Sequence, residues 1–145
     1  MRVFIVDSDD SFRRKARALL ESAEGITVVG EARAGQPALA MIHQACPDVV
    51  LLDVGALHAG SPQTMEQIRA LFAYKIIVLN EKGQERLVLD ALREGALGHL
   101  TRGKASPAEI VAAVRAVGMG EASISSGVAG RILDQVVQKR IVIGS

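Results

Sequence analysis

Short hydrophobic runs recur along this chain, and several of them stop at a polar residue. VFIV precedes Asp7, VVLL precedes Asp53, IIVL precedes Asn80 and LGHL precedes Thr101. In an open parallel α/β sheet, ligands gather in the crevice beyond the carboxyl ends of the strands. Carboxylates at the ends of two central strands can bind a cation there. Asp7 and Asp53 therefore define the candidate site.

The hydrophobic runs alternate with segments of helical periodicity, which is the pattern of a βα repeat. The predicted strands are Arg2 to Val6, Ile26 to Glu31, Val49 to Leu52, Lys75 to Leu79 and Gly98 to Thr101. The predicted helices run from after Asp9 to Gly25, from near Pro37 to before Pro47, from Pro62 to Phe72, from Gln84 to Glu94, and onward from a capping box at Ser106 to Glu109. Near-continuous apolar strands imply a sheet covered on both faces. We expect an α/β fold with a doubly wound, five-stranded parallel sheet.

Length and composition restrict the possible functions. A chain of 145 residues has the size of one domain, and a net charge of +1 provides no global field for nucleic acid or an anionic membrane. No apolar stretch reaches the roughly 18 residues of a membrane span, so we expect a cytoplasmic protein without membrane contact. The single cysteine, Cys46, is predicted to be a small buried side chain rather than a nucleophile.

A further helical segment, Ser126 to Arg140, has no place in a five-unit sheet. Its apolar stripe consists of Ile132, Leu133, Val136 and Val137. Such a stripe is buried against its own domain, a second copy or an output module. We expect a homodimer formed through this stripe, with residues 1–120 as the main domain and residues 121–145 as a C-terminal linker, extra helix and tail.

Several segments, taken in their order and spacing, match a known family. RVFIVDSDDSFRRKARALLE opens the chain, ITVVGEARAGQPAL forms the second unit, PDVVLLDV surrounds Asp53, and IIVLN, ALREGALGHLTR and SPAEIVAAVRAVGMGEASIS follow. The sequence resembles the receiver domain of bacterial two-component response regulators, of the kind that precedes a helix-turn-helix output domain. The resemblance implies a flavodoxin-like fold with strand order 2-1-3-4-5, a histidine kinase as partner and control of a transcriptional output. DNA binding is expected only through an output domain absent from this chain, since no second helical trio follows Arg140.

The resemblance also implies a phosphorylation site. Asp53 falls at the phosphoacceptor position, where its carboxylate would attack phosphorus to form an acyl phosphate. Family members hold Mg²⁺ with that aspartate, an acidic pair and a backbone carbonyl, which here correspond to Asp7, Ser8 and Gly55. Ser8 is a weaker, uncharged ligand, and Asp9 is a further candidate ligand one residue on. We therefore expect weak magnesium binding, although a dianionic phosphoryl donor needs a cation to approach a carboxylate.

Other positions of the family pattern carry unusual residues. Asn80 stands at the switch hydroxyl position, where its amide can donate to a phosphoryl oxygen, and Glu81 adds a negative charge beside it. His99 stands at the aromatic switch position. The family's lysine falls on Arg102, which can bind a phosphate bidentately, while Lys104, in a loop one residue longer than usual, is the alternative for this role.

Three functions remain open from the sequence. The first is a receiver phosphorylated on Asp53, which the retained Asp7 favours. The second is a degenerate receiver, a protein-interaction module that works without phosphate, which Ser8, Asn80 and Glu81 favour. The third is a small flavodoxin-like hydrolase with Asp53 as nucleophile, but the sequence has no Gly-rich phosphate loop and no His-Asp-Ser constellation to support it.

Overall fold

The computed structural model describes residues 1–33, 38–57, 70–125 and 127–131. Its strands are β1 (Arg2–Val6), β2 (Thr27–Ala32), β3 (Val49–Asp53), β4 (Lys75–Asn80) and β5 (Gly98–Thr101). Its helices are α1 (Asp10–Ser22), α2 (Ala38–Ala45), α4 (Glu85–Glu94) and α5 (Pro107–Gly118), with a 3₁₀ turn η1 (Val54–Leu57) after β3. The predicted strands are confirmed, with ends moved by at most one residue. The predicted helix from Pro62 to Phe72 lies outside the described residues, apart from its last three positions.

The strands form one parallel sheet in the order β2-β1-β3-β4-β5, as expected. Val6 at the end of β1 lies opposite Leu52, and Asp53 at the end of β3 lies opposite Leu79 of β4. Asn80 lies opposite Thr101 at the end of β5. Because all five strands run the same way, their carboxyl ends meet at one edge of the sheet.

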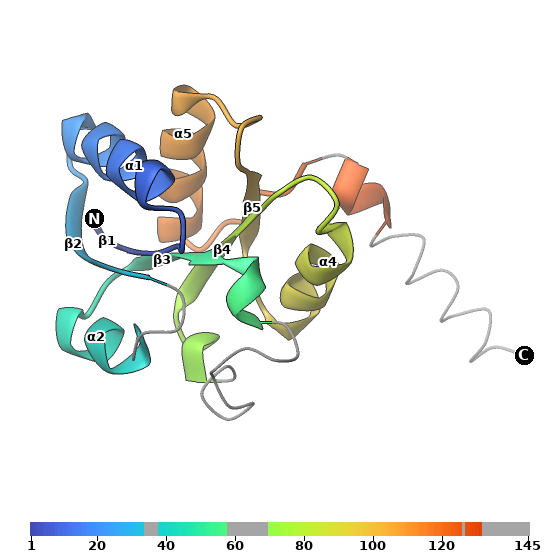
Figure 1. The fold of residues 1–145 in the computed structure, drawn as a ribbon, viewed down its shortest axis with the longest axis horizontal. Helices are drawn as coiled ribbons and strands as arrows, with labels where there is room; N and C mark the ends of the chain where they lie inside the picture. The colour runs from blue at the N-terminus through green and yellow to red at the C-terminus, as the bar shows by residue number, and fades with distance from the viewer. Residues whose placement is uncertain (34–37, 58–69, 126, 132–145) are drawn as a thin grey trace, which may run out of the picture.

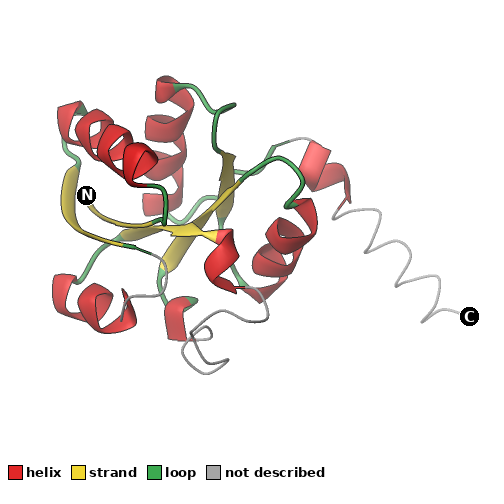
Figure 2. Ribbon diagram, viewed as in Figure 1, coloured by secondary structure: helices red, strands yellow, loops and turns green. Residues whose placement is uncertain are grey.

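Helices cover both faces of the sheet, with α1 and α5 on one face and α2 and α4 on the other (Figures 1 and 2). Side chains alternate between the faces along each strand. Val3 and Ile5 of β1 enter the core beneath α1 and α5, whereas Phe4 and Val6 enter the core beneath α2 and α4. The near-continuous apolar strands of the sequence therefore reflect two cores that share one sheet.

Local signals at the helix ends explain where two helices begin. The Asp9 side chain accepts a hydrogen bond from the backbone amide of Phe12 at 3.1 Å and so caps α1. Ser106 and Glu109 form the predicted capping box at the start of α5, with Pro107 as the first helical residue. Each such cap contributes about 1 kcal/mol to helix stability. Both caps lie close to the carboxyl edge of the sheet and hold the loops that carry the polar residues.

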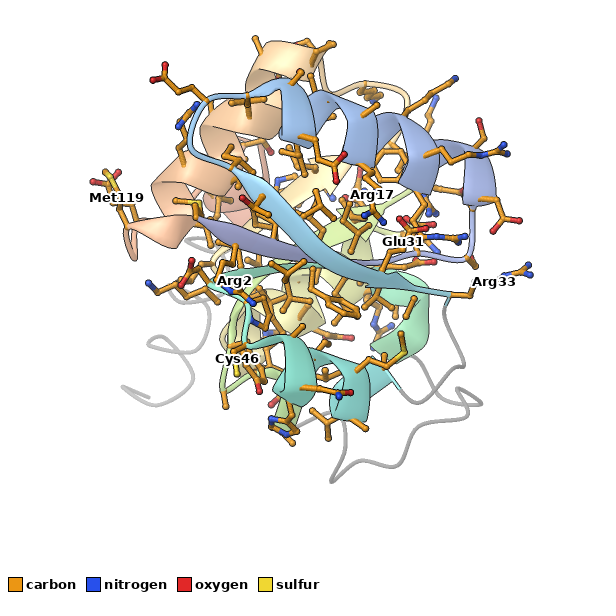
Figure 3. All side chains as sticks on the ribbon, turned by 90° about the vertical axis from the view of Figure 1, so that its left-hand side faces the viewer. Arg2, Arg17, Glu31, Arg33, Cys46 and Met119 are labelled. Carbon is orange, nitrogen blue, oxygen red and sulfur yellow. The ribbon has the colours of Figure 1, made fainter. Side chains whose placement is uncertain are left out.

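The prediction that Cys46 is buried is wrong. Cys46 is exposed, and its backbone adopts a left-handed conformation with φ of 51° between the end of α2 and Pro47. This turn directs its side chain outward, while its carbonyl accepts a hydrogen bond from Nε of Arg2 at 3.2 Å (Figure 3). Helical periodicity predicts an inward position for Cys46. The prediction fails because α2 ends at Ala45, and the periodicity does not apply beyond the last helical residue.

The chain returns to the sheet after α5. Ser123 forms a parallel bridge with Gly98 of β5, and its amide donates to the carbonyl of Leu97 at 2.8 Å. A Cβ atom at Gly98 would lie 2.8 Å from the Ser123 carbonyl oxygen, so this close approach requires glycine. Residues 127–131 are helical and begin the predicted last helix. The apolar stripe predicted for that helix lies outside the described residues.

Candidate functional site

Three polar residues are buried among those that the structure describes, and all three lie at the carboxyl edge of the sheet. Asp7 directly follows β1 and is 0% exposed, Asp53 ends β3 and is 5% exposed, and Asn80 ends β4 and is 3% exposed. The hydrophobic residues before each of them place the strand in the core and leave the polar side chain at its end. The structure therefore brings these side chains to the same edge of the sheet, and their role as a functional site stays a prediction.

Asp7 is surrounded by donors. Its Oδ1 accepts a hydrogen bond from the backbone amide of Asp9 at 2.8 Å. Nη1 of Arg102 contacts Oδ1 and Oδ2 at 2.5 and 2.6 Å. Burial raises the pKa of the Asp7 carboxyl, and the Asp9 amide and the Arg102 guanidinium oppose this effect. The guanidinium is the nearest positive charge that compensates a fully buried carboxylate.

Arg102 reaches this position from the loop after β5 and contacts three acidic side chains. Besides Asp7, its Nη1 lies 3.7 Å from Oδ2 of Asp53, and its Nη2 lies 3.1 Å from Oε1 of Glu81. Its guanidinium carbon lies 6.0 Å from the centre of the Phe12 ring. Burial works to lower the pKa of Arg102, and the charges of Asp7 and Asp53 outweigh it, so the pKa is raised. Arg102 is charged and largely enclosed.

Lys104 lies two residues further on and has an exposed side chain. Within the described part of the chain it makes no ion pair with Asp7, Asp53 or Glu81. Arg102, rather than Lys104, therefore lies among the carboxylates. Which of the two would contact a phosphoryl group stays a prediction.

Both oxygens of Asp53 accept hydrogen bonds. Oδ1 receives the backbone amide of Gly55 at 3.0 Å, and Oδ2 receives the hydroxyl of Ser8 at 3.1 Å. A Cβ atom at Gly55 would lie only 3.3 Å from Oδ1, so a larger residue would crowd this turn. The carboxylate is therefore held in one orientation, with Oδ2 toward Ser8 and Arg102.

Asn80 and His99 are engaged elsewhere. Nδ2 of Asn80 donates to Oγ1 of Thr101 and to the backbone carbonyl of Glu81, both at 3.2 Å. The amide thus fastens the ends of β4 and β5 together. Nε2 of His99 lies 3.1 Å from Oγ of Ser125, in the segment that returns to β5.

The profile of the family described as the response regulator receiver domain matches residues 3–115. The chain belongs to this family. Its carboxyl-edge aspartates and sheet order are those expected of a receiver.

Individual relatives agree with this assignment. The receiver is 35% identical over 130 residues to the response regulator UvrY of Escherichia coli K12, covering 89% of this chain and 59% of the relative. It is 33% identical over 137 residues to the transcriptional regulatory protein LiaR of Bacillus subtilis, covering 94% and 64%. The crystal structure of a LuxR-family two-component response regulator from Aurantimonas has a TM-score of 0.76 and 28% identity, and the match covers 94% of this chain and 97% of that one. The chain thus spans less than two thirds of the length of the curated relatives.

These relatives are response regulators rather than enzymes, so the hydrolase alternative has no support. The receiver also lacks, among the residues described, any helix long and apolar enough to cross a membrane.

Receiver domains generally bind Mg²⁺ at the phosphorylation site, but the residues of this receiver do not fit the ion. In the described parts of the chain no group of three or more His, Cys, Asp or Glu side chains is arranged to hold a metal. Both oxygens of Asp7 are taken by Arg102, Ser8 donates to Asp53, and Asp9 caps α1. The roles of Asp7, Asp9, Asp53 and the Gly55 carbonyl as metal ligands remain sequence predictions.

Sequence reasoning missed part of the receiver's site. It treated Ser8 only as a weak metal ligand, whereas the hydroxyl is a donor to Asp53. It did not include Arg13, although Nη1 of Arg13 donates to the Asp7 carbonyl at 2.8 Å. Its side chain is only 12% exposed and pairs with Asp10 and Glu31. Glu31, near the end of β2, was the sequence signal that could have placed Arg13. Glu31 faces the arginine-rich helix α1 and also pairs with Arg17 (Figure 3).

Proposed function

We propose that this receiver accepts a phosphoryl group from a histidine kinase on Asp53 and thereby switches a protein surface that controls a transcriptional output. The observation that carries the proposal is the environment of Asp53. It is a buried carboxylate at the end of a central strand, fixed by the Gly55 amide, with Nη1 of Arg102 3.7 Å from its Oδ2. Family membership supports the same reading.

The residues present supply orientation and charge for this transfer. Gly55 fixes Oδ1 of Asp53, and Oδ2, which accepts the Ser8 hydroxyl and lies toward Arg102, is the oxygen that attacks phosphorus. The bond from Oδ2 to phosphorus forms as the bond from phosphorus to the kinase imidazole breaks, and the imidazole keeps the electron pair and takes a proton from water. Arg102 offsets the charge on the phosphoryl oxygens, because a guanidinium matches phosphate geometry.

Phosphorylation with a small acyl phosphate, followed by intact mass measurement and peptide mapping, tests the proposal. We expect one added phosphoryl group on the peptide that contains Asp53. Asp53→Asn should abolish it. Asp90→Asn, which removes an exposed carboxylate from α4, should not. A phosphoryl group on another side chain would refute the assignment of Asp53.

A phosphate-independent receiver is the second candidate, and a specific observation favours it. Asp7 and Asp53 are already satisfied by Arg102, Ser8 and Gly55 without any added group. Such a module would hold one conformation and signal through a protein partner. Absence of any phosphoryl adduct with folded protein and excess donor would select this function.

The partners follow from the same proposal. Residues 1–120 form the receiver and residues 121–145 the linker, extra helix and tail, which lead to an output. DNA is then contacted only through an output domain, and the receiver forms a homodimer in the cytoplasm, where a histidine kinase presents its phosphoryl group. The names of two relatives, a response regulator and a transcriptional regulatory protein, support a receiver that acts through an output domain.

A further inference from the structure

We infer that the guanidinium of Arg102 is the resident cation of the site at the carboxyl edge of the sheet and competes with a divalent metal ion for Asp7. The inference concerns the unphosphorylated protein, so it goes beyond the proposed phosphoacceptor function and does not depend on whether Asp53 is a phosphoacceptor. The competition is one of position rather than of net charge.

The contacts at Asp7 place Arg102 where a metal would have to bind. Nη1 lies 2.5 Å from Oδ1 and 2.6 Å from Oδ2, and Oδ1 also accepts the amide of Asp9. Mg²⁺ lies about 2.0–2.1 Å from its ligand oxygens, so a magnesium ion and Nη1 cannot both contact the Asp7 carboxylate from the side that Arg102 occupies. The Asp7 side chain is fully buried and has no second exposed side to offer.

Arg102 is held in this place by further contacts. Nη2 pairs with Glu81 at 3.1 Å, Nη1 lies 3.7 Å from Asp53, and the guanidinium faces the Phe12 ring. Only 11% of the Arg102 side chain is exposed. A metal ion must therefore move a guanidinium that is bound on several sides, and each lost contact weakens the apparent metal affinity.

The other oxygen ligands do not compensate for this cost. The Ser8 hydroxyl, at the position where a second carboxylate would help, is neutral and donates to Asp53. The Asp9 carboxylate accepts the Phe12 amide at the start of α1. A metal would have to disturb the Ser8–Asp53 hydrogen bond, the Asp9 cap and the Arg102–Asp7 pair together. The guanidinium binds Asp7 without disturbing the hydrogen bond or the cap.

Electron paramagnetic resonance of free Mn²⁺, titrated with the full chain and no phosphodonor, tests the inference. We expect Arg102→Met, which removes the donors but keeps an unbranched side chain, to bind Mn²⁺ at least about tenfold more tightly than the wild type. Lys104→Met is the matched control, because Lys104 lies two residues after Arg102, has an exposed side chain and carries the same charge. We expect it to bind Mn²⁺ as the wild type does.

Equal Mn²⁺ affinity of the wild type and Arg102→Met would overturn the inference, and so would an equal gain in Lys104→Met. If Arg102→Met does not fold, a Mg²⁺ titration of the wild type decides, with the amides of Asp9 and Gly55 as reporters because they donate to Asp7 and Asp53. Shifts that do not saturate support a resident guanidinium, whereas shifts that saturate below about 1 mM contradict it. Since no phosphoryl donor is present, these results are independent of whether Asp53 is a phosphoacceptor.

Discussion

Nε2 of His99 accepts a hydrogen bond from the backbone amide of Ser125 at 3.2 Å. A ring nitrogen can accept this bond only while it carries no proton, so the neutral imidazole holds the segment after α5 against β5. Nδ1, which then carries the proton, is buried and has no hydrogen-bond partner within the described residues. Burial lowers the pKa of His99 below the ordinary 6.5.

We predict that residues 121–125 loosen from β5 as the pH falls. An undocked His99 takes up a proton near pH 6.5, whereas the docked imidazole does so only at lower pH. The docking free energy is therefore fully present above pH 6.5 and is lost as the pH falls through that value toward the pKa of the docked ring. Hydrogen exchange of the Ser123 and Ser125 amides, corrected for its intrinsic pH dependence, measures the change.

The control for this effect is a comparison of two histidines. His99→Phe should remove the pH dependence, and His43→Phe, which alters an exposed histidine beside Tyr74, should keep it. The cavity beside His99 is also lined by charged residues, namely Lys82, Glu85, Lys104, Glu109 and Arg131. Protection factors that stay constant between about pH 8 and about pH 5 would show that His99 does not control docking.

We predict that Arg102→Met destabilises the fold by about 3–5 kcal/mol at neutral pH, because it leaves the Asp7 carboxylate buried without its charged partner. The loss should shrink as the pH falls, since burial raises the pKa of Asp7 and a protonated carboxyl no longer needs the guanidinium. Urea unfolding of Arg102→Met, Asp7→Asn and the double variant at several pH values measures the coupling. Additive effects of the two single substitutions would mean that the pair is not coupled.

We predict two effects of Ser8→Asp. The free energy of unfolding should fall by about 1–3 kcal/mol, because a donor to Asp53 is replaced by a carboxylate that repels it. Mg²⁺ binding, followed by calorimetry, and phosphorylation of Asp53 should both increase, since the added oxygen is a hard ligand. The gain in metal affinity should be larger when Arg102→Met is also present. If neither metal affinity nor phosphorylation increases, the phosphoacceptor function should be abandoned for a switch that does not use phosphate.

We predict that Leu133→Asp weakens self-association. The reason is the apolar stripe of the sequence around Leu133, which lies outside the described residues and exceeds what a five-stranded domain needs to bury. Sedimentation velocity of wild type and variant across a concentration series provides the measurement. Lys139→Asp changes a charged residue of the same segment and serves as the control. If the wild type and Leu133→Asp are both monomeric at high concentration, the stripe does not serve self-association and packs against another surface.

The sheet could be predicted from the sequence because each strand is a short apolar run that ends at a polar residue or a turn. The start of α5 could be predicted as well, since Ser106, Pro107 and Glu109 act within one turn. Both signals are local. The orientation of Cys46 was not accessible in this way, because it depends on a left-handed turn that no local pattern marks.

The candidate site could be predicted only in part. Asp7 and Asp53 follow from strand ends, so their proximity needs nothing beyond parallel topology. The contact between Arg102 and Asp7 joins residues 95 positions apart, and it depends on which way a long side chain turns out of its loop. Family resemblance placed Arg102 at a phosphate-binding position, and only the structure shows which carboxylate it contacts without phosphate.

The bridge between Ser123 and Gly98 also has a consequence for solubility. An unpaired edge strand offers its amides and carbonyls to other chains, and such edges promote aggregation. Here the amide of Ser123 binds the carbonyl of Leu97, and its carbonyl accepts the amide of His99, so the chain itself pairs with the outer side of β5. A fragment cut directly after α5 would keep the whole sheet and expose this edge. The few residues beyond the last core helix therefore protect the protein from joining its sheet to that of a neighbour.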